Sequence, residues 1–261
     1  MEHQSPPLLS IDHISIRFGG LVAISDMHFS VRSGELLSLI GPNGAGKTTA
    51  FNVVTGFLSP SSGEIRYNGK LLNGLKTCQI ADLGIVRTFQ KTSLFTSCTA
   101  HDNVLIGLHR KGKSRAWEIL LDLPKIRAEK RAMQEKAAEI LEFVGLGGRG
   151  GHLAGGLSYG EQRLLGLAIA LAADPKLLLL DEPVSGMNPT ETTSFMRLLD
   201  RVRERNVTML LVEHDMRMVM EVSDRIVVLN QGRIIADGSA SDIQKNPDVI
   251  AAYLGHGRRR A

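Results

Sequence analysis

Aromatic residues, cysteine and long apolar runs are all scarce in this sequence. Of its 261 residues only 5% are aromatic and two are cysteines, Cys78 and Cys98, which form neither a CxxC motif nor a metal-binding pattern with histidine. We therefore expect no metal or redox site built on cysteine. The apolar run Leu177–Leu180 is far shorter than the roughly 20 residues that a membrane-spanning helix needs. The polar opening Met1–Ser10 does not read as a signal peptide, so we expect a cytoplasmic protein that meets a membrane only through partners.

Charge of one sign is not concentrated either. The net charge is +4 and the isoelectric point is about 9.2, which alone would allow a nucleic acid or an anionic lipid surface as a partner. The basic residues are dispersed, however, and the one basic run, Arg258–Arg260, is typical of a solvated terminal tail. We therefore expect no nucleic-acid partner.

The apolar pattern predicts an α/β fold. Short alternations between residues 11 and 35 indicate antiparallel strands. Compact apolar runs at Leu36–Ile40, Leu177–Leu180 and Val207–Val212 are typical of parallel strands that are buried on both faces. Apolar residues recur at helical spacing between Thr190 and Arg205. The prediction is a parallel α/β core with an N-terminal antiparallel β layer.

A helical subdomain is expected at about residues 95–160. The sequence there becomes charged and helix-prone, and Ile126–Val144 carries its apolar residues at helical spacing. A glycine-rich stretch, 145–156, closes this segment. We predict a single domain over residues 8–255, with tails at 1–7 and 256–261.

A phosphate-binding loop is the strongest single motif. The pattern G-x-x-x-x-G-K-[ST] lies between an apolar strand and a predicted helix, as this motif requires. Its residues are Gly41, Pro42, Asn43, Gly44, Ala45, Gly46, Lys47 and Thr48, followed by Thr49. Glycines let successive backbone N–H groups point at phosphate oxygens, and the positive end of the helix adds to the attraction. Lys47 would reach the β- and γ-phosphates, and the Thr48 hydroxyl would bind Mg²⁺. The sequence therefore predicts a site for a nucleoside triphosphate.

Two carboxylates end the strand at 177–180, at the sheet edge where α/β folds bind ligands. Asp181 would hold Mg²⁺, and Glu182 would polarise the attacking water. Ordinary turn acids are the alternative. His214 ends another apolar strand and would contact the γ-phosphate, although a strand-end histidine is often structural. Gln90 would reach Mg²⁺ or the water, although the pattern around it also fits a surface glutamine.

A second glycine motif precedes an apolar helix. Leu157-Ser158-Tyr159-Gly160-Glu161-Gln162 reads in part as a capping box, because Ser158 and Glu161 have that spacing. The segment L-S-x-G-x-Q upstream of L-L-L-L-D-E-P nevertheless resembles the signature of ABC ATPases. The resemblance extends over nearly the whole chain, since phosphate loop, Gln90, signature, acid pair and His214 appear in the family's order.

The resemblance implies further roles. ATP would lie between two such subunits, and the loop from Ser158 to Gly160 of one would face the γ-phosphate held by the other. Phe18 falls where the family has an aromatic residue that stacks on adenine, worth on the order of 1–3 kcal/mol; the alternative is a phenylalanine in the hairpin core.

Several segments are similar to one branch of the family, the LivG-type ATPases of branched-chain amino acid importers. They are Gly41–Asn52, Gly84–Gln90, Gly186–Pro189, Glu213–Met216 and Val249–Gly255. Two departures from common patterns stand out. Asn188 replaces an aspartate common in ABC proteins, as in this branch, and Asn188-Pro189 also reads as a helix start. Leu164, Gly166 and Ile169 replace residues that are usually polar in the signature helix.

The resemblance implies an ATP-hydrolysing subunit on the cytoplasmic face of the cell membrane, held there peripherally. Its expected partners are a second ABC ATPase subunit, identical or different, membrane permeases and, indirectly, a periplasmic or extracellular binding protein. Import of urea or another small amide, and export of lipid or lipopolysaccharide, remain alternatives for the transported substrate. A soluble ABC ATPase of DNA repair or translation is the alternative from another class.

Overall fold

The computed structural model describes residues 6–88, 94–109 and 124–254. The chain divides into two compact units, which are described separately. The core unit comprises residues 1–87, 176–182 and 199–261, and the helical unit comprises residues 88–175 and 183–198. The predicted domain limits, with tails at 1–7 and 256–261, remain a prediction.

The first layer of the core unit is a four-stranded antiparallel sheet with the order β2-β1-β4-β5. Its strands are β1 (Leu9–Phe18), β2 (Leu21–Val31), β4 (Ser62–Tyr67) and β5 (Lys70–Leu71). The long β1–β2 hairpin turns at Gly19-Gly20, where Phe18 pairs with Leu21. This sheet confirms the predicted N-terminal antiparallel layer.

The second layer of the core unit is a six-stranded sheet with the order β10-β9-β3-β8-β7-β6. Its strands are β3 (Leu36–Ile40), β6 (Ile85–Arg87), β7 (Leu177–Asp181), β8 (Thr208–Val212), β9 (Arg225–Asn230) and β10 (Arg233–Gly238). All neighbours pair in parallel except β10, which pairs antiparallel with β9. Every residue of β3, β7 and β8 is buried, as the continuous apolar runs predicted.

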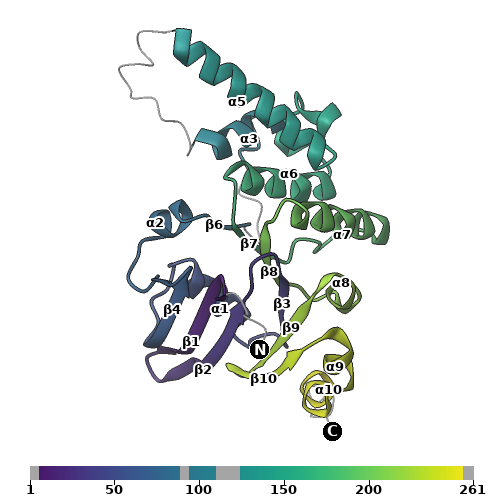
Figure 1. Cartoon of the computed structure of the whole chain (residues 1–261). Helices are drawn as coiled ribbons and strands as arrows, with labels where there is room; N and C mark the ends of the chain where they lie inside the picture. The colour runs from purple at the N-terminus through teal and green to yellow at the C-terminus, as the bar shows by residue number, and fades with distance from the viewer. Residues whose placement is uncertain (1–5, 89–93, 110–123, 255–261) are drawn as a thin grey trace. The chain divides into compact units, whose positions relative to one another are not determined.

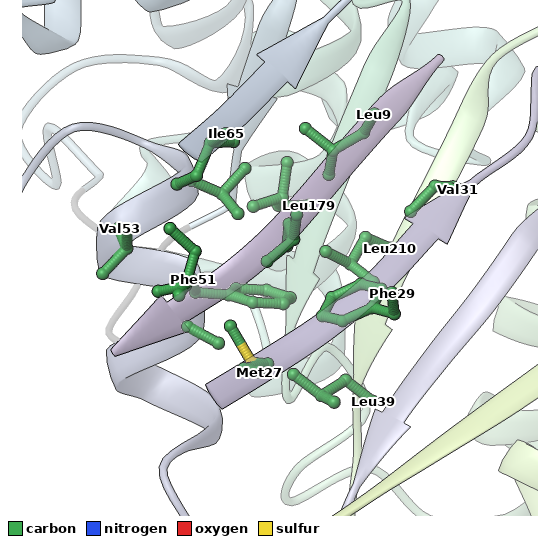
Figure 2. Close-up of a cluster of buried hydrophobic side chains, with 14 of the residues drawn as sticks. Leu9, Met27, Phe29, Val31, Leu39, Phe51, Val53, Ile65, Leu179 and Leu210 are labelled. Carbon is green, nitrogen blue, oxygen red and sulfur yellow. The ribbon is translucent and has the colours of Figure 1, made fainter. Parts of the chain in front are cut away.

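Helices accompany these sheets in the described part of the core unit (Figure 1). They are α1 (Lys47–Val54), α2 (Thr77–Asp82), α8 (Met216–Val222), α9 (Ala240–Lys245) and α10 (Pro247–Leu254). Figure 2 shows the hydrophobic cluster that joins both sheets to α1. Phe51 of α1 lies close to Met27 and Phe29 of β2, and Leu179 and Leu210 reach the same cluster from β7 and β8. Packing of α1 in this cluster fixes the helix that begins at the phosphate loop.

The helical unit contains α3 (Ala100–His109), α5 (Pro124–Phe143) and α6 (Tyr159–Ala172), with two short 3₁₀ turns, Gly147–Arg149 and Ala154–Gly156. Helix α7 (Pro189–Arg203) begins in this unit and ends in the core unit. Gly107 of α3 lies so close to α6 that an added Cβ would be 2.7 Å from the Ile169 carbonyl oxygen. Within the described ranges, none of the helices is long and apolar enough to cross a membrane.

Candidate nucleotide-binding site

The phosphate loop connects β3 to α1 and is fixed by main-chain contacts. Gly41 lies directly against β9, because a Cβ added there would be only 1.9 Å from the Leu229 carbonyl oxygen. The Ala45 carbonyl accepts a hydrogen bond from the Gly232 N–H at 2.9 Å. Gly46 has a φ of 109° and precedes the first helical residue, Lys47. The loop therefore presents the amide end of α1 in a shape that glycine permits.

Lys47 lies inside this loop and is only 6% exposed. Its Nζ donates hydrogen bonds to the carbonyl oxygens of Gly41 at 2.7 Å and Pro42 at 3.0 Å. Burial lowers the pKa of Lys47, and the nearby charges of Glu182 and Asp181 partly oppose this shift. The lysine is thus a buried cation within reach of both carboxylates, which suits a group that binds phosphate.

Asp181 and Glu182 occupy different environments at the end of β7. The Asp181 side chain is 2% exposed and forms an ion pair of 2.6 Å with Arg87. Glu182 is partly accessible, with a side chain that is 21% exposed. Its backbone N–H donates to the Val212 carbonyl at 2.8 Å, and its φ of 48° lies in the left-handed region. Adjacent carboxylates therefore differ in burial and partner, as two separate roles would require.

His214 follows β8, the strand that pairs with β7. The strand that leads to His214 is therefore the direct neighbour of the strand that ends at Asp181. The His214 Nε2 lies 2.9 Å from Glu182 Oε1, where an N–H donates to the carboxylate. The sequence therefore brings a histidine and a carboxylate together from segments 32 residues apart.

Phe18 is 48% exposed. The alternative interpretation, in which Phe18 belongs to a hairpin core, is therefore wrong. The hairpin that carries it also touches the phosphate loop, since a Cβ added at Gly46 would lie 3.1 Å from the Ala23 carbonyl oxygen of β2. The exposed ring of Phe18, on the same hairpin, is available to stack on a base.

The other predicted residues of the phosphate loop and of the first turn of α1 differ in exposure. Thr48 is exposed and Thr49 is partly buried, both in the first turn of α1, while Asn43 and Gly44 are exposed in the loop. No three or more His, Cys, Asp or Glu side chains come together to hold a metal by themselves within residues 6–88, 94–109 and 124–254. Gln90 lies outside the described residues.

Ser158 and Gly160 belong to the helical unit, at the start of α6. Ser158 caps this helix: its hydroxyl accepts from the Glu161 N–H at 3.3 Å, and its own N–H donates to Glu161 Oε2 at 2.8 Å. The bond that the Ser158 N–H donates lowers the pKa of the Glu161 carboxyl most; the Ser158 hydroxyl and Arg149 lower it further, while burial partly opposes them. Gly160 is buried against Glu191, whose Oε1 would be 2.7 Å from an added Cβ. The capping-box interpretation of this motif is confirmed.

The helix start predicted at Asn188-Pro189 is also confirmed in the helical unit. The Asn188 side-chain oxygen accepts from the N–H groups of Thr190 and Glu191 at 3.0 Å each. Asn188 is thus the N-cap of α7, a position where asparagine is strongly preferred. Leu164, Gly166 and Ile169 are partly buried on α6.

Two contacts of the phosphate-loop region were missed by sequence reasoning. Arg87, quoted in a motif but given no role, binds Asp181. The Tyr253 hydroxyl of α10 lies near the Gly41 backbone; burial raises the pKa of Tyr253, and this backbone contact partly offsets the shift. No local sequence pattern predicts either contact, because each joins segments that are far apart along the chain.

Comparisons with known proteins agree with this geometry. Residues 24–185 match a family model described as ABC transporter, and residues 233–258 match one described as Branched-chain amino acid ATP-binding cassette transporter. The chain is 46% identical over 252 residues to the high-affinity branched-chain amino acid transport ATP-binding protein BraF of Pseudomonas aeruginosa, covering 96% of this chain and 99% of the relative. Its identity to the corresponding LivG protein of Escherichia coli is 44%, with the same coverage.

Solved structures of ATP-binding cassettes share the fold. A nucleotide-free cassette from an ABC transporter has a TM-score of 0.84 and 31% identity, with 96% of this chain and 100% of that chain covered. A cassette in its ADP conformation has a TM-score of 0.84 and 30% identity, with the same coverage. These likenesses confirm the predicted α/β P-loop fold. Because the first family model spans more than half of the chain and the relatives span nearly all of it, the chain belongs to the ATP-binding cassette family of ABC transporters and is a nucleotide-binding ATPase of that family.

Proposed function

We propose that this ATPase powers the import of branched-chain or other apolar amino acids from the cytoplasmic face of the cell membrane. The observation that carries this proposal is its 46% identity to BraF across 96% of the chain. The match of residues 233–258 to the branched-chain amino acid model adds support from the C-terminal segment. Membrane permeases and a second ATPase subunit would be its direct partners. A binding protein outside the membrane would act on it only through the permeases.

The phosphate loop is proposed to hold the ATP phosphates. Its buried Lys47 now donates to two loop carbonyls, and γ-phosphate oxygens would be stronger acceptors for the same charged group. The amide groups at the start of α1 would add their partial positive charge. Phe18 would stack on the adenine, since its ring is exposed at the end of the hairpin that contacts this loop through Ala23. These contacts account for binding of the nucleotide and not for its hydrolysis.

The residues present fit a magnesium ion. Thr48 and Asp181 supply hydroxyl and carboxylate oxygen, which Mg²⁺ prefers, and this ion commonly uses few protein ligands together with substrate phosphates. When bound, Mg²⁺ neutralises charge on the phosphate oxygens. Gln90 is proposed as a further contact to the ion or the attacking water.

Glu182 is proposed as the general base for hydrolysis. It is the more accessible carboxylate of the pair, and His214 orients it through a 2.9 Å hydrogen bond. Removal of a proton from water by a positioned carboxylate is typically worth 10²–10⁴-fold in rate. Ser158 and Gly160 would complete the site from the second subunit, whether that subunit is a copy of this chain or a different one.

Uptake by a strain that lacks the gene tests the proposed substrate. Uptake of labelled leucine should be lost, then restored by the wild-type gene but not by Lys47→Ala, which removes the phosphate-binding charge. Labelled urea should enter equally in all strains. Loss of urea uptake alone would favour the small-amide alternative. Unchanged uptake of both, with transport of a lipid or sugar lost instead, would contradict the proposal.

A further inference from the structure

Arg87 connects three parts of the core unit next to the proposed cation site. Its Nη2 lies 2.6 Å from Asp181 Oδ2, and its Nη1 donates to Asn52 Oδ1 at 2.7 Å. The guanidinium carbon also lies 5.5 Å from the centre of the Phe51 ring. The side chains of Arg87 and Asp181 are 11% and 2% exposed. The pair is therefore largely removed from water, where a charge interaction is stronger than at a surface.

The Arg87–Asp181 pair lies where two neighbouring strands end. Strands β6 and β7 are parallel neighbours, with Arg87 paired to Leu179. Arg87 and Glu182 are also the last core-unit residues before the chain passes into the helical unit. In the sequence, Gln90 follows Arg87 by three residues. The ion pair thus fastens together the ends of two strands that both lead out of the core unit.

Asn52 links the same guanidinium to the phosphate loop. It lies on α1, the helix that begins at Lys47. An arginine fork can hold an amide and a carboxylate at once, which a lysine cannot do with the same geometry. The Arg87 Nε is buried and finds no acceptor among the described residues. A buried guanidinium normally has all of its N–H groups bonded. Because the Nε–H of Arg87 has no such bond within the described part of the chain, moving this side chain breaks fewer hydrogen bonds than moving a fully bonded arginine would.

We propose that Arg87 is a positioning residue that competes with the divalent cation for Asp181, holding the carboxylate in place and releasing it when the cation binds. The proposal rests on the proposed function, since it needs Asp181 to face a nucleotide-bound cation. A guanidinium and a divalent cation are both attracted to this carboxylate and repel each other. Cation binding therefore weakens the bond that ties the end of β6 to the end of β7.

The test measures cation affinity and not turnover. Mn²⁺ is titrated into the full-length protein saturated with the imido analogue of ATP, and bound Mn²⁺ is followed by electron paramagnetic resonance. Arg87→Gln removes the competing charge and should tighten Mn²⁺ binding about tenfold. Asn52→Ala leaves the charge but removes one anchor of the guanidinium, and should tighten binding about two- to threefold. Arg66→Gln is the matched control and should change nothing, because Arg66 forms an exposed ion pair with Glu64, also at 2.6 Å.

The outcomes separate the inference from the proposed function. Mn²⁺ affinity that is equal or weaker in folded Arg87→Gln overturns the competition. If Arg87→Gln fails to fold because the buried ion pair with Asp181 is lost, Asn52→Ala decides: tighter binding supports the inference and unchanged binding overturns it. If the wild-type chain binds neither the ATP analogue nor Mn²⁺, the proposed function fails, and the inference fails with it.

Discussion

Glu182 combines an unusual backbone conformation with a fixed side chain. A φ of 48° is rare for a residue with a Cβ and costs on the order of 1–3 kcal/mol. The neighbouring strand compensates, since the Glu182 N–H bonds to Val212 and its carboxylate to His214. Such local strain is found where the direction of a side chain matters to function. At the scale of the residue, the fold thus sets where this carboxylate points.

Replacing Glu182 with glutamine tests its role as the base. Glu182→Gln keeps the size and hydrogen bonding of the side chain, so nucleotide affinity should stay close to the wild-type value. Phosphate release should fall by about 10²–10⁴-fold, because the amide cannot take a proton from water. Lys47→Ala is the contrast, since it should weaken nucleotide binding itself. Near-normal hydrolysis in Glu182→Gln would remove it as the base and leave His214 with Gln90 as the next candidates.

Two glycines of the phosphate loop should respond differently to the same substitution. Gly41→Ala places a Cβ 1.9 Å from a main-chain oxygen of Leu229, whereas Gly44→Ala meets nothing within 4 Å although its φ is 79°. We expect Gly41→Ala to lower the free energy of unfolding by about 2–3 kcal/mol through overpacking. Gly44→Ala should cost about 1 kcal/mol through backbone strain alone. Urea unfolding measures both, and equal losses would contradict the role of β9 in fixing the loop.

At the scale of the elements, the sequence predicted what is local. A continuous apolar run identifies β3, β7 or β8 because burial on both faces leaves no polar position. The phosphate loop is likewise contiguous, with fixed spacing between its glycines and Lys47. Long-range contacts carry no such pattern. Arg225 bonds to Glu35, 190 residues away, at 2.8 Å, and the Arg87–Asp181 pair spans 94 residues. Strand order and these partners therefore emerge only from the folded chain.

Helix α10 shows how a distant element reaches the site. Its Val249 joins a buried cluster with Ile40, the last residue of β3 before the loop. Tyr253 comes four residues after Val249 and so lies on the same face of the helix, where its hydroxyl is near the Gly41 backbone. The segment that matches the branched-chain amino acid model, 233–258, includes this helix. The segment that matches the branched-chain amino acid model thus contacts the phosphate loop, which lies in the part of the chain that matches the general ABC transporter model.

Loss of the Tyr253 hydroxyl should loosen the phosphate loop without disturbing the helix. A hydrogen bond contributes at most about 1 kcal/mol net, so loss of this polar contact in Tyr253→Phe should weaken ATP binding by up to about fivefold. A fluorescent ATP analogue measures the affinity, and thermal melting should show little change. Ile250→Ala serves as the control because Ile250 lies on α10 but is 44% exposed. Equal effects of the two substitutions would mean that the contact between Tyr253 and Gly41 does not position the loop.

At the scale of the whole molecule, the proposed catalytic groups are divided between two units. Lys47, Asp181, Glu182 and His214 belong to the core unit, and Ser158 and Gly160 belong to the helical unit. Ser158 and Gly160 are fixed locally, the first as the cap of α6 and the second by its contact with Glu191. A preformed loop of this kind loses little conformational entropy when it meets a partner. This organisation supports the proposal that ATP binding joins two subunits.

A shared ATP site makes the association of two subunits depend on nucleotide. If ATP is bound between two subunits, a variant that binds but does not hydrolyse it should remain closed, because turnover is what reopens the interface. Glu182→Gln should therefore accumulate a dimer in ATP and Mg²⁺, while Lys47→Ala stays monomeric because its phosphate site lacks the binding charge. Analytical sedimentation distinguishes the two states. Since the second subunit can be a different chain, the measurement is made on the isolated protein and on the pair co-expressed with the other ATPase of the same transporter. ATP-independent dimers, or monomeric Glu182→Gln with nucleotide bound in both preparations, would rule out a shared ATP site and leave Ser158 as a helix cap alone.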